Sequence, residues 1–214
     1  MVNLINSNIV IVAQNLNPSI FTQLWLYTQG VFSEKEFKQN SFFTPAAVQV
    51  LTDDSELLIV PERLQLTFLK NDKQDVLAKH IIGTIVEALP HTPYNALGFN
   101  FNWVSEPSDD IIFAENLREM FLSPKNPLSS YFNVDSARFG MYMAKDIDNM
   151  KLKLDMKPVK HLQDSNKEAL QLNFNFHKDL RDDIVQAIKS SLEQWLDARK
   201  LSEEIVMEVS KRWT

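Results

Sequence analysis

The sequence predicts an α+β fold, with mainly antiparallel sheet and helices packed on one side of it. Polar and apolar residues alternate in several short segments, which is typical of half-buried strands. Residues 62–68 (ERLQLTF) and 168–174 (EALQLNF) also read alike, and an amphipathic helix follows each of them. We therefore expect two similar βββα halves, roughly 46–89 and 137–199. Unrelated amphipathic strands would share the same apolar spacing, and only the common Glu and Gln go beyond it.

A strand and a helix are expected near the amino terminus. Residues 8–13 (NIVIVA) are mostly β-branched and nearly uninterrupted, which predicts a strand buried on both faces. A helix is expected over about 20–27, because Asn17 and Ser19 are favourable helix caps. Residues 33–43 fit either a loop or an edge strand.

Further elements complete the first half. We expect, in order, a hairpin of strands 46–51 and 57–60, a strand at 64–69, a helix at 76–89 and a strand at 97–104. The helix is predicted by apolar residues that recur at three- and four-residue intervals, and Pro90 ends it. In the last strand, aromatic residues alternate with Asn100 and Asn102, as in a half-buried strand.

A segment rich in structure-breaking residues follows. Residues 105–135 contain Pro107, Pro124 and Pro127 around a short predicted helix at about 109–121. We expect a single compact domain over residues 1–214, with a seam in this segment because few regular contacts should cross it. The seam would separate a first half at 1–104 from a second half at 136–214.

The second half is expected to repeat the strand-and-helix order. It should hold strands at 137–144, 150–159 and 170–176, followed by helices at 182–199 and 202–212. The first two strands form a predicted hairpin about residues 146–149. The second strand of that hairpin carries several lysines between Lys151 and Lys160, and we interpret it as an edge strand with the lysines outward. Ser202 is the predicted cap of the last helix.

Composition argues against several classes of protein. The formal net charge is −6 and no Lys/Arg cluster is visible, so we expect no nucleic-acid partner. The chain has no cysteine, which removes disulfides, thiol catalysis and cysteine-bound metals. No apolar stretch has the length of a membrane span and the amino-terminal residues lack the pattern of a signal peptide. We therefore expect a cytoplasmic protein with no membrane partner.

The amino-terminal segment is unusual because no charged side chain occurs between Met1 and Ser33. One explanation is that its strand and helix pack deep inside the molecule. The other is that a second subunit or a protein partner covers it, since interface cores are depleted of charge. The second explanation predicts self-association as a homodimer or larger homo-oligomer.

Amide side chains share one side of two predicted strands. They are Asn100 and Asn102 on one strand and Gln171, Asn173 and Asn175, with His177, on the other. If helices cover only one face of the sheet, this face is open and could hold an extended peptide or a polar ligand without using charge. A solvated sheet face without function is the alternative.

Features of an enzyme are sparse. Only four glycines occur and no two are close, which excludes a phosphate-binding loop or dinucleotide fingerprint. The loop that contains His91 and Tyr94 is the most enzyme-like segment, yet no partner that would orient a catalytic base is identifiable. The histidines at 80, 91, 161 and 177 lack metal-ligand spacing. We therefore predict no catalytic residues, no metal and no cofactor.

Together these observations predict a non-enzymatic cytoplasmic binding or assembly protein that acts through protein–protein contacts. The alternative is a small-molecule ligand-binding protein or enzyme with a cleft between its halves. In that case His91, Tyr94 and His177 are the candidate binding residues.

Overall fold

The computed structural model describes residues 1–107, 110–134, 136–160 and 167–213. The strands are β1 (Val2–Ala13), β2 (Phe42–Phe43), β3 (Val48–Leu51), β4 (Ser55–Val60), β5 (Arg63–Phe68), β6 (Tyr94–Ser105), β7 (Met141–Ile147), β8 (Met150–Lys160) and β9 (Glu168–Asp179). The helices are α1 (Gln23–Thr28), α2 (Gln74–Ala88), α3 (Asp110–Phe121), α4 (Ile184–Leu192) and α5 (Trp195–Ser210), with short 3-10 turns at Pro18–Ile20 and Glu34–Glu36.

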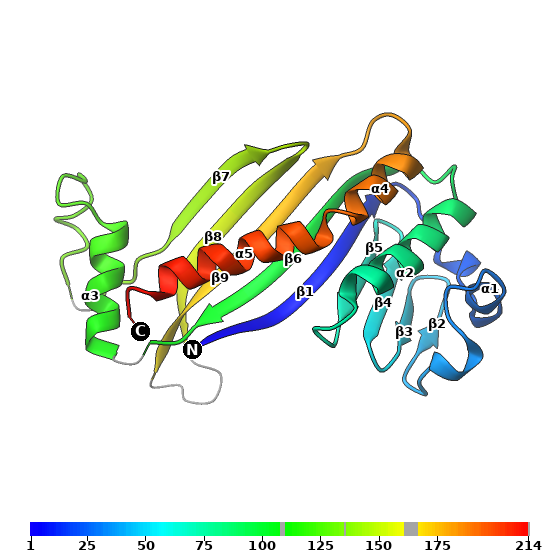
Figure 1. Cartoon of the computed structure of the whole chain (residues 1–214), viewed down its shortest axis with the longest axis horizontal. Coiled ribbons are helices and arrows are strands. Elements are labelled where there is room, and N and C mark those ends of the chain that lie inside the picture. The colour runs from blue at the N-terminus through cyan, green and yellow to red at the C-terminus, as the bar shows by residue number, and fades with distance from the viewer. Residues whose placement is uncertain (108–109, 135, 161–166, 214) are drawn as a thin grey trace.

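Within these residues, nine strands form one sheet in the order β2-β3-β4-β5-β1-β6-β9-β8-β7 (Figure 1). Every neighbouring pair is antiparallel. The helices pack against one side of this sheet, with α2, α4 and α5 lying across it (Figure 1). The predicted α+β class, antiparallel pairing and one-sided helix packing are therefore confirmed.

Burial alternates along the strands because only one face of the sheet is covered. In β6, Phe99 and Phe101 are buried under the helices, whereas Asn100 and Asn102 are half-buried on the other face. In β1, Ile11 is fully buried but Val12 is 41% exposed. The prediction that residues 8–13 are buried on both faces was wrong. Their β-branched composition reflects strand propensity rather than complete burial.

The centre of the core is an aromatic cluster beneath the start of α5. The indole of Trp195 is fully buried, and its ring centroid lies 5.0 Å from that of Phe68, 5.2 Å from Phe99 and 4.6 Å from Phe101. These rings come from β5 and β6, so the cluster joins a late helix to strands from much earlier in the chain. Such contacts add to the stabilisation that area burial alone supplies.

The carboxy-terminal helices break at a different place from the predicted one. The sequence predicts helices at 182–199 and 202–212, but α4 ends at Leu192 and α5 begins at Trp195. The break allows Trp195 to enter the core. Ser202, the predicted cap, lies inside α5 and is buried, and its hydroxyl accepts a hydrogen bond from Trp103 Nε1 at 2.9 Å.

Segments distant in the sequence meet at one end of the sheet. The amino group of Met1 donates to the carbonyl of Glu106 at 2.8 Å. Trp213 Nε1 donates to the hydroxyl of Ser105 at 3.0 Å, and that hydroxyl lies 2.7 Å from the hydroxyl of Ser210. Both ends of the described chain are thus tied to the end of β6 (Figure 1).

The sheet order places four strands on one side of a central pair, β1 and β6, and three on the other, with the two-residue β2 as the additional strand. On one side, β3, β4 and β5 lead to β1; on the other, β7, β8 and β9 lead to β6. A helix follows each set in the chain, α2 after β5 and α4 after β9. The matching glutamines, Gln65 and Gln171, are both half-buried, between buried apolar neighbours. This order agrees with two βββα halves, but duplication and the seam at 105–135 stay predictions.

Two smaller predictions also need correction. The strand predicted at 150–159 is not an edge, since β7 pairs along the outer side of β8. The helix predicted at 20–27 is shorter and less deeply packed: Leu26 is buried, whereas Leu24 is 70% exposed. In the described part of the chain, no helix is long and apolar enough to cross a membrane.

Replacing Trp195 with alanine should lower the free energy of unfolding by about 3–5 kcal/mol, because the cavity would border several rings. Leu196→Ala is the matched control, since this neighbour is 49% exposed in the same helix, and its expected loss is below about 1 kcal/mol. Urea unfolding followed by circular dichroism measures both. Equal losses would show that helix propensity, and not aromatic packing, determines the effect.

Candidate functional site

The uncovered face of the sheet carries amide side chains on three adjacent strands, β1, β6 and β9. We refer to seven of these side chains as the amide face; by rows across the strands they are Asn8, Asn100 and Asn175, then Asn6, Asn102 and Asn173, then Gln171. The rows arise because the antiparallel registers place like residues opposite one another. Facing side chains on neighbouring strands lie close enough to interact.

The sequence predicts five members of this surface, those on β6 and β9, and the structure confirms that they share one face. It also shows that the two strands are neighbours. The prediction omits Asn8 because it treats residues 8–13 as buried on both faces, and it omits Asn6 because the predicted strand begins after this residue, whereas β1 begins at Val2. The signal that could have found them is the alternation of Asn6 and Asn8 with Ser7 and Ile9, which are buried.

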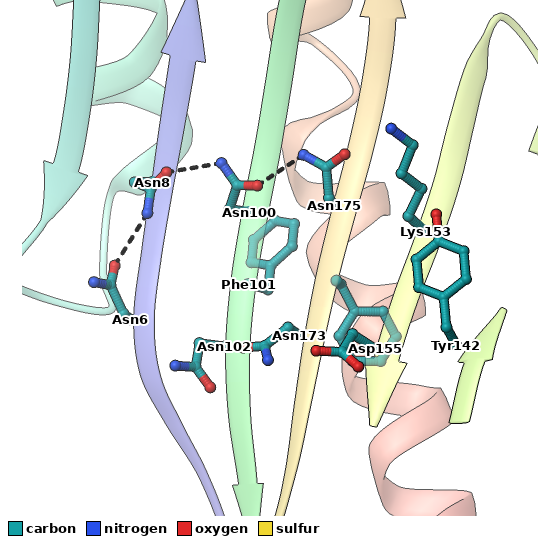
Figure 2. Close-up of a pocket in the computed structure, with 11 residues that line it drawn as sticks. Asn6, Asn8, Asn100, Phe101, Asn102, Tyr142, Lys153, Asp155, Asn173 and Asn175 are labelled. Atoms are coloured by element: carbon teal, nitrogen blue, oxygen red, sulfur yellow. Dashed lines mark hydrogen bonds between the residues drawn. The ribbon is translucent and has the colours of Figure 1, made fainter. Parts of the chain in front are cut away.

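A hydrogen-bonded ladder runs across the three strands (Figure 2). Nδ2 of Asn175 donates to Oδ1 of Asn100 at 2.8 Å, and Nδ2 of Asn100 donates to Oδ1 of Asn8 at 2.8 Å. Asn8 in turn donates to Oδ1 of Asn6 at 3.4 Å. All three bonds run in the same direction, so each polarises the next.

The ladder orients the amides but does not exhaust their hydrogen-bonding capacity. An amide side chain has two N–H donors and an oxygen with two lone pairs. Asn100 uses one donor and one lone pair within the ladder, which leaves one of each. In the next row, Asn102 accepts from Nε2 of Gln171 at 3.1 Å. The surface therefore presents fixed donors and acceptors side by side.

Six members of the amide face, all except Gln171, line a hollow of about 410 Å³. Tyr142 from β7 and Lys153 and Asp155 from β8 complete its rim (Figure 2). One cationic and one anionic side chain leave the rim with no net charge. Asp155 also lies 3.6 Å from Lys157 in an exposed ion pair, which contributes little stability.

The amides of this surface can bind a ligand through hydrogen bonds. Amides do not titrate in the physiological range, and they bind by donating and accepting hydrogen bonds. The ring of Tyr142 is 63% exposed and offers an apolar flank beside the amides. Such a combination suits a ligand with peptide-like polar groups and little charge.

Tyr94, one of the predicted binding residues, lies in the core. A register shift between Val12 and Ala13 pairs Tyr94 with Ala13 and places it among the buried residues. Burial raises the pKa of the phenol, and the Thr92 side chain offsets only part of this. That contact falls short of hydrogen-bond geometry, because the Tyr94 hydroxyl has no hydrogen-bond partner in the described residues.

The two histidines lie elsewhere. His91 is exposed in the loop between α2 and β6. His177 is half-buried on β9, opposite Gly98 and Lys151, and its Nε2 lies 3.1 Å from Oδ1 of Asp179. The structure therefore does not bring His91, Tyr94 and His177 together, and a binding role for any of them stays a prediction.

The described residues contain no group of three or more His, Asp or Glu side chains that could hold a metal ion. His161 lies outside the described residues.

The sequence matches no protein-family model and no curated protein. The inference of function consequently depends on the geometry of the amide face.

Asn100→Asp should destabilise the fold at pH 7 by about 1–3 kcal/mol, because the new carboxylate cannot donate to Asn8 and two acceptors would face each other. Urea unfolding measures the loss. The matched control is Asn102→Asp, which keeps the acceptor that Gln171 uses.

The charged side chains near the two asparagines would, by themselves, produce the opposite result. Lys153 shares the row of Asn100, and Asp155 shares the row of Asn102. A simple charge effect would therefore penalise the control more than the test variant. Equal or reversed losses would show that the direction of the ladder carries no stability.

Tyr94→Phe tests the buried phenol. The raised pKa means that the protonated phenol favours the folded state, and this stability is lost as the pH rises above the unfolded value of about 10. The wild type should therefore lose stability relative to Tyr94→Phe between pH 8 and about pH 10.5. At pH 8 the variant should be equal to the wild type or up to about 1 kcal/mol more stable, since it removes an unpartnered hydroxyl. A clear loss at pH 8, measured by urea unfolding, would mean that the hydroxyl makes a stabilising hydrogen bond.

Proposed function

We propose that this chain is a non-enzymatic binding protein of the cytoplasm that acts through protein–protein contacts, with the amide face as its binding surface. The observation that carries the proposal is a set of hydrogen-bonded amides around a neutral hollow, on a sheet face that the helices leave uncovered. Fixed donors and acceptors reduce the ordering that binding requires.

A peptide segment of a partner protein matches this chemistry. Peptide groups carry one donor and one acceptor each, and the uncommitted positions on the amides supply the complementary groups. Nine of the eleven residues that line the hollow are uncharged, and charge depletion is typical of the core of a protein interface. Tyr142 stands beside it with its ring exposed, and tyrosine is enriched among the residues that dominate binding energy.

A second candidate function is the binding of a small polar molecule. The volume of the hollow, about 410 Å³, lies within the range of ligand pockets. This candidate differs from the sequence-based alternative, which expects a cleft lined by His91, Tyr94 and His177.

The uncharged amino-terminal segment is a second candidate surface for protein–protein contacts, with a protein partner or with a second subunit. On α1, Leu24 is 70% exposed and Tyr27 is 51% exposed, and the preceding Ile20 is 37% exposed. These apolar side chains lie within the segment that lacks charge. Their exposure favours a covering partner over complete packing inside one chain.

Asn173→Arg should weaken peptide binding at least about tenfold, since the new side chain would fill the hollow. Asn173 lies outside the hydrogen-bonded ladder, so the variant should keep its fold. The probe is the set of peptides enriched from a displayed library of random dodecapeptides, with affinities measured by fluorescence polarisation.

His91→Ala is the control, because this loop residue is exposed and lies outside the amide face; its affinity should equal that of the wild type. Enrichment of no peptide, or equal affinity of the wild type and Asn173→Arg, would contradict the proposed peptide binding. Binding of a small polar molecule that Asn173→Arg abolishes would favour the second candidate.

A further inference from the structure

β7 forms an open edge of the sheet. Among the residues that the structure describes, β7 pairs with β8 on one side and has no strand or helix beyond its other side (Figure 1). Its inner five residues, 142–146, are all exposed. At the opposite end of the sheet, β2 has only two residues. An edge strand presents unpaired backbone donors and acceptors that can pair with another strand.

This edge has few of the features that normally prevent such pairing. β7 contains no proline, and its register with β8 is continuous from Met141 to Ile147, without a bulge. Two of its exposed side chains are large and apolar: Tyr142 is 63% exposed and Met143 is 42% exposed. Lys145 and Asp146 are the charged residues of the strand, and they restrict which register is acceptable.

We propose that a second copy of this chain pairs with β7 in antiparallel fashion, about a two-fold axis at Ala144. In an antiparallel pair, the side chains of two directly opposed residues point to the same face of the sheet. An axis between two residues would oppose residues whose side chains point to different faces, so the axis must pass through a residue. An axis at Lys145 or at Asp146 would place like charges directly opposite, which is destabilising.

The axis at Ala144 pairs the whole strand. It places Tyr142 opposite Asp146 of the other copy and Met143 opposite its Lys145, so no like charges face each other. An axis at Met143 also avoids like charges, but it aligns only residues 141–145 with each other. The register at Ala144 therefore gives the most backbone hydrogen bonds.

An apolar hollow beside the edge favours the same occupant. It has a volume of about 510 Å³ and lies on the helix-facing side, between β7, β8 and α5. Met143, Leu152, Leu154 and Ile205 supply its apolar lining. The second copy would place its own Lys145 beside Met143, and the aliphatic part of a lysine side chain covers apolar surface well. The pair of β7 strands and the contact of Lys145 with the apolar hollow make a small interface, so we expect a dimer that dissociates on dilution.

The pairing would also join the amide faces. Asn175, Lys153 and Ala144 belong to one row, and Ala144 would continue this row into the second copy. A two-fold axis perpendicular to the sheet leaves both amide faces on the same side. The two copies of Asn175 would be separated by five strand spacings, about 24 Å. A partner with two matching segments could then bind both hollows, with a gain in avidity.

Cysteine cross-linking tests the proposed register, because the natural chain contains no cysteine. Ala144→Cys places two thiols opposite each other at the axis and should form a disulfide-linked dimer on mild oxidation. The control is Tyr142→Cys, whose two thiols would be about 14 Å apart along the strands, beyond the reach of a disulfide. A mixture of Tyr142→Cys and Asp146→Cys should cross-link between the two variants.

A pair of charge variants tests the same register without cross-linking. Met143→Lys would place the new lysine of each copy opposite Lys145 of the other copy. The two pairs of like charges should raise the dissociation constant of the dimer about fivefold. Met143→Glu places the new carboxylate opposite Lys145 and should maintain or tighten the dimer. Light scattering over a range of protein concentrations measures both, and loss of the methionine side chain is common to the two variants.

Three outcomes would overturn the proposal. The wild type could remain a monomer up to about 100 μM, well above the micromolar dissociation constants at the weak end of standard-size interfaces. Ala144→Cys and Tyr142→Cys could cross-link equally, which would indicate random collision. A dimer could also form that Ala144→Cys does not trap; if Leu24→Glu then dissociates it, the interface lies at α1 instead.

Discussion

The pairing of β1 with β6 is the contact on which the rest of the structure depends. Eleven residue pairs join these two strands, from Val2 with Ser105 to Ala13 with Tyr94. Each strand pairs on its other side with the end of an antiparallel meander, β1 with β5 of the four strands β2–β5 and β6 with β9 of the three strands β7–β9. Without the central pair, the sheet would divide into two parts, and the buried rings of β5 and β6 would lose their common contact with α5.

One-sided coverage of this sheet determines where function can reside. The helices cover the apolar side of β6 and β9, and the polar side of these strands faces outward. On β1, β6 and β9 the outward side carries the seven amides. Since an amide bonds to its own kind as donor and acceptor at once, identical residues on neighbouring strands can form a continuous ladder, which a row of carboxylates or lysines could not do.

The sequence was sufficient to predict those strands and helices in which apolar residues recur with a clear period. Alternation predicts the strands, three- and four-residue spacing predicts α2, and both are local properties of a few residues. Contacts between distant segments were not predictable in the same way. Nothing local indicates that β1 lies beside β6, that Tyr94 turns inward where their register shifts, or that the chain breaks before Trp195 to fill the core. These depend on pairing across the whole chain.

The same reasoning explains the candidate site. Its amides on β6 and β9 follow from alternation, whereas the ladder depends on strand order and register, which alternation does not define. His91, Tyr94 and His177 were selected for their chemistry. The sequence places His91 in a loop and His177 on the side of the amides, but it could not show that Tyr94 lies in the core.

The late position of α5 has a consequence for how the chain folds during synthesis. β1, β3, β4, β5 and β6 leave the ribosome first and can pair with one another before β9 exists. Until then β6 is an outer strand with an unpaired edge, and its buried-side rings have no Trp195 to cover them. Unpaired strand edges and exposed apolar rings make folding intermediates prone to aggregation. The interval between synthesis of Ser105 and of Trp195 is therefore when the nascent chain most needs protection.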